Sequence, residues 1–107
     1  AQVPRLLLEY LKVPYEDELF KTKAEWLAYR QENIKKWPLV DLPYLIDGDV
    51  RLTSTVPICY YIINKYGPAS MLGNSLQQTA VLDMYCWSID SMGIGLAVLL
   101  WAQGTKK

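Results

Sequence analysis

The apolar positions near the start of the chain follow a helical period. They recur three or four residues apart at Val3, Leu6, Leu7, Tyr10 and Leu11. This spacing predicts a helix over residues 1–11, in which Pro4 is tolerated only in the first turn. Residues 12–14 then break the pattern. Residues 15–20 are rich in acidic side chains, which are depleted from sheet interiors, so this stretch predicts a weak strand at an exposed sheet edge.

A second period, of two residues, lies near the middle of the chain. The apolar run 44–46 and the alternating Val50 and Leu52 flank the pair Asp47-Gly48. Glycine and aspartate both tolerate the positive φ that a two-residue turn requires. The sequence therefore predicts a hairpin of two short antiparallel strands with its turn at Asp47-Gly48.

A helix is predicted directly after the hairpin. Residues 56–66 are apolar on almost every face, and Ser54 and Thr55 carry hydroxyl groups that can cap the first backbone amides of such a helix. Gly67-Pro68 is expected to end it, since glycine readily adopts a left-handed conformation and proline cannot continue a helix. The hairpin is thus expected to run straight into a helix.

Two capping boxes predict the starts of two further helices. Thr22-x-x-Glu25 opens one helix in the first half of the chain, and Ser75-x-x-Gln78 opens another in the C-terminal third. In such a box the first and last side chains satisfy backbone amides that have no partner within the helix. The predicted order is therefore helix, strand, helix, hairpin, helix and helix.

The composition argues against several classes of function. The 107 residues include 11 basic and 11 acidic side chains, so neither a nucleic-acid surface nor a patch for anionic membranes is indicated. The chain has no histidine, which removes His-based catalytic triads and most metal sites. Cys59 and Cys86 form no Cys-x-x-Cys motif and are expected to be reduced core residues in a cytosol-like compartment. The apolar run 94–101 is too short to span a bilayer.

Residues 42–48, Leu-Pro-Tyr-Leu-Ile-Asp-Gly, and the polar pair that opens the next helix closely resemble the glutathione transferase family, especially its mu-like branch. The resemblance covers about residues 1–92. It implies an α/β fold: a thioredoxin-like glutathione-binding domain over residues 1–66, a linker over 67–74, and the start of an all-helical domain over 75–107. It also implies that a first strand is missing here. In the family that strand carries the group that stabilises the glutathione thiolate, so no catalytic residue is expected in this chain.

The resemblance implies how the end of the hairpin would hold glutathione. Pro43 is expected to follow a cis peptide bond that turns the backbone of Leu42 toward the cysteinyl part of glutathione. Ser54 and Thr55 are expected to bind the γ-glutamyl carboxylate, and the free amides and positive dipole of a helix start suit such a group. On this motif alone, an ordinary hairpin followed by a capped helix is the simpler interpretation.

The resemblance also implies contacts from two other segments. Trp26, with Lys23 before it and Arg30 after it, matches residues that contact the glycine end of glutathione. Asp83 matches a residue that reaches the glutathione of a partner subunit. Two alternatives remain open, because Trp26 is as readily a core anchor, and Asp83 an exposed helical carboxylate without a role.

Two functions follow from the resemblance. The first is a glutathione transferase that conjugates the glutathione thiol to electrophiles, without a metal, as a homodimer or part of a larger assembly in the cytoplasm. The second is a non-catalytic transferase-like subunit that serves as an interaction module. A tyrosine-bearing strand upstream of residue 1 in the native protein would favour the enzyme.

Overall fold

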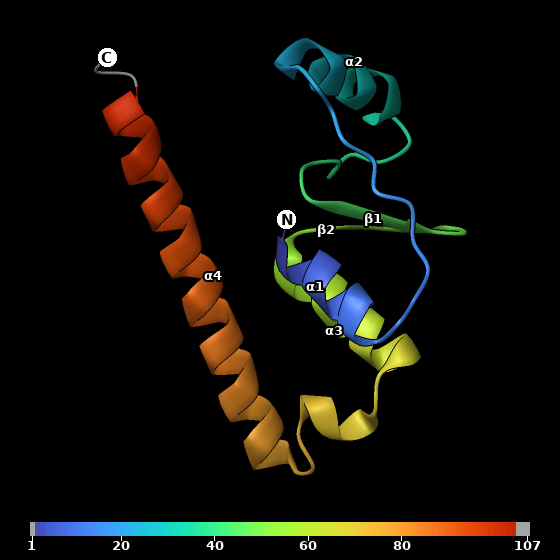
Figure 1. Cartoon of the computed structure of the whole chain (residues 1–107), viewed down its shortest axis with the longest axis vertical. Helices are drawn as coiled ribbons and strands as arrows, with labels where there is room; N and C mark the ends of the chain where they lie inside the picture. The colour runs from blue at the N-terminus through green and yellow to red at the C-terminus, as the bar shows by residue number, and fades with distance from the viewer. Residues whose placement is uncertain (1, 105–107) are drawn as a thin grey trace. The chain divides into compact units, whose positions relative to one another are not determined.

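The computed structural model describes the backbone of residues 2–104 and the side chains of residues 2–92 (Figure 1). The chain divides into two compact units, Ala1–Gly67 and Pro68–Lys107. The first unit contains, in order, α1 (Gln2–Tyr10), α2 (Lys23–Asn33), β1 (Tyr44–Asp47), β2 (Val50–Thr53) and α3 (Thr55–Tyr66). The second contains a short 3₁₀ helix, η1 (Ala69–Leu72), and α4 (Leu76–Gly104). The predicted helices and hairpin are confirmed.

The two strands form an antiparallel hairpin with a two-residue loop. Asp47 pairs with Val50, so the loop consists of Gly48 and Asp49, one position later than the sequence pattern predicts. Gly48, at the first loop position, has a φ of 58°. Glycine adopts such a positive φ at a lower energetic cost than residues that carry a side chain. Asp47 is instead the last residue of β1, because its backbone pairs with Val50, and its carboxylate contacts α3.

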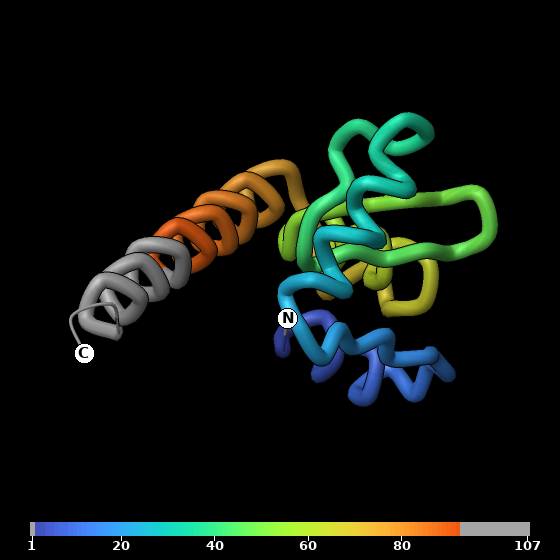
Figure 2. Tube along the Cα trace, turned by 90° about the horizontal axis from the view of Figure 1, so that it is seen from above, coloured from blue at the N-terminus to red at the C-terminus, as the bar shows by residue number. Residues whose placement is uncertain are grey.

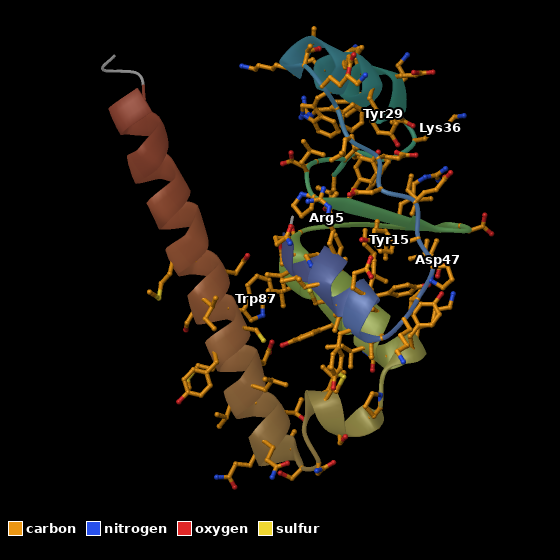
Figure 3. All side chains as sticks on the ribbon, viewed as in Figure 1. Arg5, Tyr15, Tyr29, Lys36, Asp47 and Trp87 are labelled. Atoms are coloured by element: carbon orange, nitrogen blue, oxygen red, sulfur yellow. The ribbon has the colours of Figure 1, made fainter. Side chains whose placement is uncertain are left out.

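The Asp47 carboxylate fastens the turn end of the hairpin to α3 (Figure 3). Its Oδ2 atom accepts a hydrogen bond from the Tyr61 hydroxyl at 2.5 Å and forms an ion pair with the Lys65 Nζ at 2.5 Å. Both partners lie on one side of α3, four residues apart. The hydrogen bonds from Lys65 and Tyr61 lower the pKa of Asp47, and the bond to Asp47 raises the pKa of each partner.

The core lies where α1 and α3 pack together on one face of the hairpin (Figure 1). Leu8 of α1 and Ile58 and Ile62 of α3 are buried against one another. Partly buried apolar side chains surround them: Leu7, Leu11, Val13, Leu45 and Leu52. Leu45 and Leu52 are paired across the two strands, so a shift of one residue would expose both of them.

α1 ends in a left-handed turn at Lys12, whose φ is 56°. The Lys12 amide donates to the Glu9 carbonyl at 3.1 Å, and the Val13 amide donates to the Leu8 carbonyl at 3.0 Å. These two bonds make a Schellman motif, completed by the packing of Val13 against the core. A lysine therefore holds a conformation that costs about 1–2 kcal/mol for a residue with a side chain.

The segment between α1 and α2 is irregular, as Figure 2 also shows, so the predicted edge strand over residues 15–20 is wrong. The sheet of the described residues has two strands, β1 and β2. The acidic side chains make side-chain contacts instead: Asp17 pairs with Arg5 of α1 at 3.0 Å, and Glu18 accepts the Tyr44 hydroxyl. A strand needs a neighbour for its backbone hydrogen bonds, and none of the described strands lies alongside this segment.

α3 ends at Gly67, although not by the predicted left-handed stop. Gly67 has a φ of −94° and a ψ of 167°, which is an extended conformation. The following proline explains the difference, because a residue that precedes proline is held in extended conformations. The Gly67 amide still donates to the Ile63 carbonyl at 2.8 Å and closes the last turn of the helix.

The second unit turns from η1 into α4 through Gly73, whose φ is 94°. The predicted capping box at Ser75 is confirmed. The Ser75 hydroxyl accepts the Gln78 amide at 3.1 Å, and the Gln78 side chain accepts the Asn74 amide at 2.7 Å. Within the described residues, none of the helices combines the length and the apolar character that a bilayer crossing demands.

The substitution Asp47→Asn tests what this carboxylate contributes to stability. Folding lowers the pKa of Asp47 from its ordinary value of 3.8, so its contribution is present above that pH and is lost as the pH falls through the folded value. The variant should have a lower free energy of unfolding at pH 7, and its difference from the unaltered protein should shrink as the pH falls below about 4 and disappear once the pH is below the lowered folded pKa of Asp47. Urea unfolding over this pH range measures the difference, with Asp49→Asn in the loop as the control. A difference that does not change with pH would contradict the expectation.

Candidate functional site

The strand register places the Leu42–Pro43 peptide next to the start of α3. The peptide bond between these two residues is cis, as the resemblance implied. The Pro43 carbonyl accepts the Ser54 amide at 3.3 Å, directly beyond the Tyr44–Thr53 pair. Two groups are expected to bind glutathione here: the backbone of Leu42 and the polar pair Ser54 and Thr55. They therefore meet at the end of the hairpin opposite its turn.

Leu42 has a half-exposed side chain, and its amide is already engaged. It donates a hydrogen bond to the Asp41 Oδ1 atom at 2.8 Å. A ligand that accepts from the Leu42 amide must therefore displace or share this bond with Asp41. The sequence analysis missed Asp41, although an aspartate directly before an exposed amide is a common local acceptor.

Ser54 adopts a backbone conformation that is rare for a residue with a side chain. Its φ is 76° and its ψ is 140°, whereas a capping residue normally has a negative φ in the β region. The Ser54 hydroxyl makes no capping bond to α3, and Thr55 is the first helical residue rather than a cap. The predicted capping role of the two hydroxyls is therefore wrong. Strain of this kind costs about 1–3 kcal/mol and is concentrated at functional sites.

The first turn of α3 leaves backbone amides without helical partners. The Ile58 amide makes the first bond of the helix, to the Ser54 carbonyl at 3.2 Å. The Thr55 and Val56 amides precede it, and Pro57 has no amide hydrogen. Two amides at the positive end of the helix dipole can therefore bind an anion such as a carboxylate.

α2 carries the three residues expected at the glycine end of glutathione. Lys23, Trp26 and Arg30 are spaced three and four residues apart, so they share one side of the helix. Lys23 and Arg30 are exposed, and Trp26 is half-buried. The capping box is confirmed, because the Glu25 amide donates to the Thr22 hydroxyl at 3.1 Å.

Trp26 is joined to the cis-proline turn through aromatic rings. Its ring centroid lies 5.3 Å from that of Phe20 and 6.4 Å from that of Tyr44, the residue after Pro43. It also stacks with Tyr29 at 6.0 Å. Trp26 thus packs within an aromatic cluster, and the same contacts hold it near the turn where Leu42 lies. The sequence analysis did not predict these ring partners.

Asp83 lies in α4 and belongs to the second unit, where it is half-buried. The other predicted site residues all belong to the first unit. Within the first unit, the structure brings together the groups of the hairpin and connects them to α2.

The hydroxyls of two tyrosines in the first unit are engaged by carboxylates. Tyr44 donates to Glu18, and Tyr15 donates to Glu9 at 3.2 Å. Burial, followed by the hydrogen bonds with Glu18 and Tyr29, raises the pKa of Tyr44. These tyrosines therefore remain protonated at neutral pH. In the described part of the chain, no cluster of three or more His, Cys, Asp or Glu side chains is arranged to hold a metal ion.

The segment that contains the cis-proline hairpin and the helix start beside it matches a family model. Residues 1–70 match the model of the glutathione S-transferase N-terminal domain. The chain belongs to the glutathione S-transferase family, and its first unit has the thioredoxin-like α/β fold of that domain.

The relatives include several mu-class enzymes. The class-mu 26 kDa isozyme of Schistosoma japonicum is 33% identical over 96% of this chain and 46% of its own length. The class-mu 26 kDa isozyme of Schistosoma mansoni is 39% identical over 91% of this chain and 48% of its own length. Glutathione S-transferase Mu 2 of Mus musculus is 30% identical over 84% and 49%. The chain thus spans about half the length of these curated relatives, and no solved structure matches it significantly.

Ser54→Gly separates backbone strain from the chemistry of the hydroxyl. Glycine accepts a positive φ without a steric cost, so this variant should gain about 1 kcal/mol in free energy of unfolding. Lys12→Gly is the matched control, since Lys12 also has a positive φ and lies outside the site. Urea unfolding should show a gain for both variants. A loss of stability in Ser54→Gly would mean that the serine side chain supports the fold.

Proposed function

We propose that the protein binds glutathione at the end of the hairpin opposite its turn, and that it is part of an enzyme that conjugates glutathione to electrophiles. The observation that carries the proposal is the strained backbone of Ser54 beside the cis-Pro43 turn, together with a Ser54 hydroxyl that makes no capping bond to α3. The Ser54 amide donates a hydrogen bond to the Pro43 carbonyl at 3.3 Å. This bond brings the backbone around Leu42, which can bind a peptide, next to the start of α3, which can bind an anion. The family membership of the chain supports glutathione as the ligand.

Each part of glutathione has a chemically suitable partner in this proposal. The γ-glutamyl carboxylate binds the Ser54 and Thr55 hydroxyls and the first amides of α3. The cysteinyl backbone binds the backbone of Leu42, whose orientation is set by Pro43. The positive side chains of α2, Lys23 and Arg30, and the indole of Trp26 bind the glycine end. Charge complementarity supports binding at both ends of the site, because glutathione carries a carboxylate at each end.

Catalysis requires a donor aimed at the glutathione sulfur. Each unit by which such a donor lowers the thiol pKa favours the thiolate by about 1.4 kcal/mol. The Tyr15 and Tyr44 hydroxyls are committed to carboxylates and do not meet this need. We therefore propose that neither Tyr15 nor Tyr44 is the catalytic group.

The proposal further includes a cytoplasmic homodimer, in which Asp83 reaches the glutathione of the partner subunit, and a role in detoxification.

Ser54→Ala and Thr55→Val should each weaken glutathione binding by about 1–2 kcal/mol, because each removes a hydrogen bond to a charged carboxylate. Isothermal titration calorimetry well below the melting temperature measures this. Ser91→Ala, an exposed serine of α4, is the control and should bind normally. Unchanged affinity in both variants would exclude the two hydroxyls from the site.

Conjugation distinguishes the enzyme from a non-catalytic subunit. A polypeptide of residues 1–107 should conjugate a chromogenic aryl halide no faster than free glutathione at the same pH, since the Tyr15 and Tyr44 hydroxyls are committed to carboxylates and not to the sulfur. The native protein should turn over the same substrate well above that rate. A native protein that is retained on a glutathione matrix without turnover would favour the interaction subunit. Turnover by residues 1–107 alone would show that a tyrosine within them supplies the donor.

A further inference from the structure

α2 is attached to the rest of the first unit in an unusual way. None of its residues is buried, and its backbone does not come close to that of any other helix or strand of the described chain. Figure 1 shows it on the opposite side of the hairpin from α1 and α3. At 11 residues it is too short to be stable as an isolated helix. Its position must therefore depend on side-chain contacts.

Those contacts are made by aromatic rings that meet at Tyr44. Tyr29 of α2 stacks on Tyr44 with ring centroids 5.4 Å apart and planes inclined by 10°. Trp26 stacks on the same ring at 6.4 Å and 27°. Phe20, just before α2, meets Tyr44 edge-on at 6.3 Å, and Trp37, beyond its end, does so at 5.7 Å. The Tyr44 ring is thus the shared neighbour of rings before, within and after α2.

Tyr44 is itself held firmly. It is the first residue of β1, is paired with Thr53, and directly follows Pro43. Its hydroxyl donates to Glu18 in the segment that leads into α2. Because successive strand residues face opposite sides, Tyr44 projects toward α2 while Leu45 faces the core. A ring fixed in the hairpin therefore supports a helix that has no buried residue of its own.

We infer that Tyr44 is a positioning residue, whose ring sets the place of α2 and so the place of Lys23, Trp26 and Arg30 against glutathione. This inference rests on the proposed glutathione site. One half of that site, at the hairpin, is built on paired backbone. The other half, on α2, is held by stacked rings, and only this half responds to the loss of the Tyr44 ring.

Tyr44→Leu and Tyr44→Phe test the ring in the full-length protein. Leucine removes the stacking, whereas phenylalanine keeps the ring and loses only the hydroxyl. In hydrogen–deuterium exchange, the α2 amides of Tyr44→Leu should exchange roughly tenfold faster while those of α1 and α3 stay unchanged. Tyr44→Phe should exchange like the unaltered protein. Tyr29→Leu removes the same stack from the helix side, leaves β1 intact, and should behave like Tyr44→Leu.

Glutathione titrations then test positioning rather than stability. Tyr44→Leu and Tyr29→Leu should weaken binding about tenfold, and Tyr44→Phe by less than about twofold. Lys23→Gln should weaken binding several-fold in the unaltered protein and have almost no effect in the Tyr29→Leu background, because α2 no longer presents the lysine.

Two results would overturn the inference. The first is an unchanged glutathione affinity and unchanged α2 exchange in both leucine variants. The second is an effect of Lys23→Gln that is equally large in both backgrounds. If the unaltered protein itself binds no glutathione, the proposed function fails and the positioning role fails with it. Binding by the unaltered protein with no dependence on Tyr44 refutes the positioning role alone.

Discussion

The pairing of Tyr44 with Thr53 is the constraint on which the rest of the first unit depends. It sets Pro43 beside Ser54, so that a cis peptide and a helix start share one end of the hairpin. A slip of one residue would exchange the two faces of both strands. Leu45 would then leave the core, and Tyr44 would turn away from the aromatic rings. The same register therefore supports the core, the aromatic cluster and the candidate site.

The two faces of the hairpin hold the chain by different means. On one face, aliphatic side chains of α1 and α3 pack closely around Ile58 and Ile62, which are each 1% exposed. On the other face, α2 is held by stacked rings and by a capping box, with no buried residue of its own. Elements with little buried surface open most easily, so α2 is the part of the first unit where binding and local stability are most closely connected.

The candidate site combines features that suit a peptide with a carboxylate at each end. Backbone groups around Leu42 fit an extended peptide, and the first turn of α3 offers amides and dipole to an anion. The strain at Ser54 is consistent with a functional constraint, since a simple cap would have left this residue in an ordinary conformation. The chain belongs to the glutathione S-transferase family and spans about half the length of its curated relatives. Its fold follows from the family, whereas its reaction is proposed.

Local signals in the sequence determined the helices, the two capping boxes and the hairpin, because a period of apolar residues or a hydroxyl beside free amides acts within a few residues. The family resemblance, and not these local signals, brought Pro43 and Ser54 into one predicted site. Tertiary structure alone decided the features that depend on distant partners. The turn lies past Asp47, whose carboxylate is bound by α3. Residues 15–20 stayed irregular because none of the described strands lies beside them. The rings that meet at Tyr44 come from separate segments, and only folding brings such residues into contact.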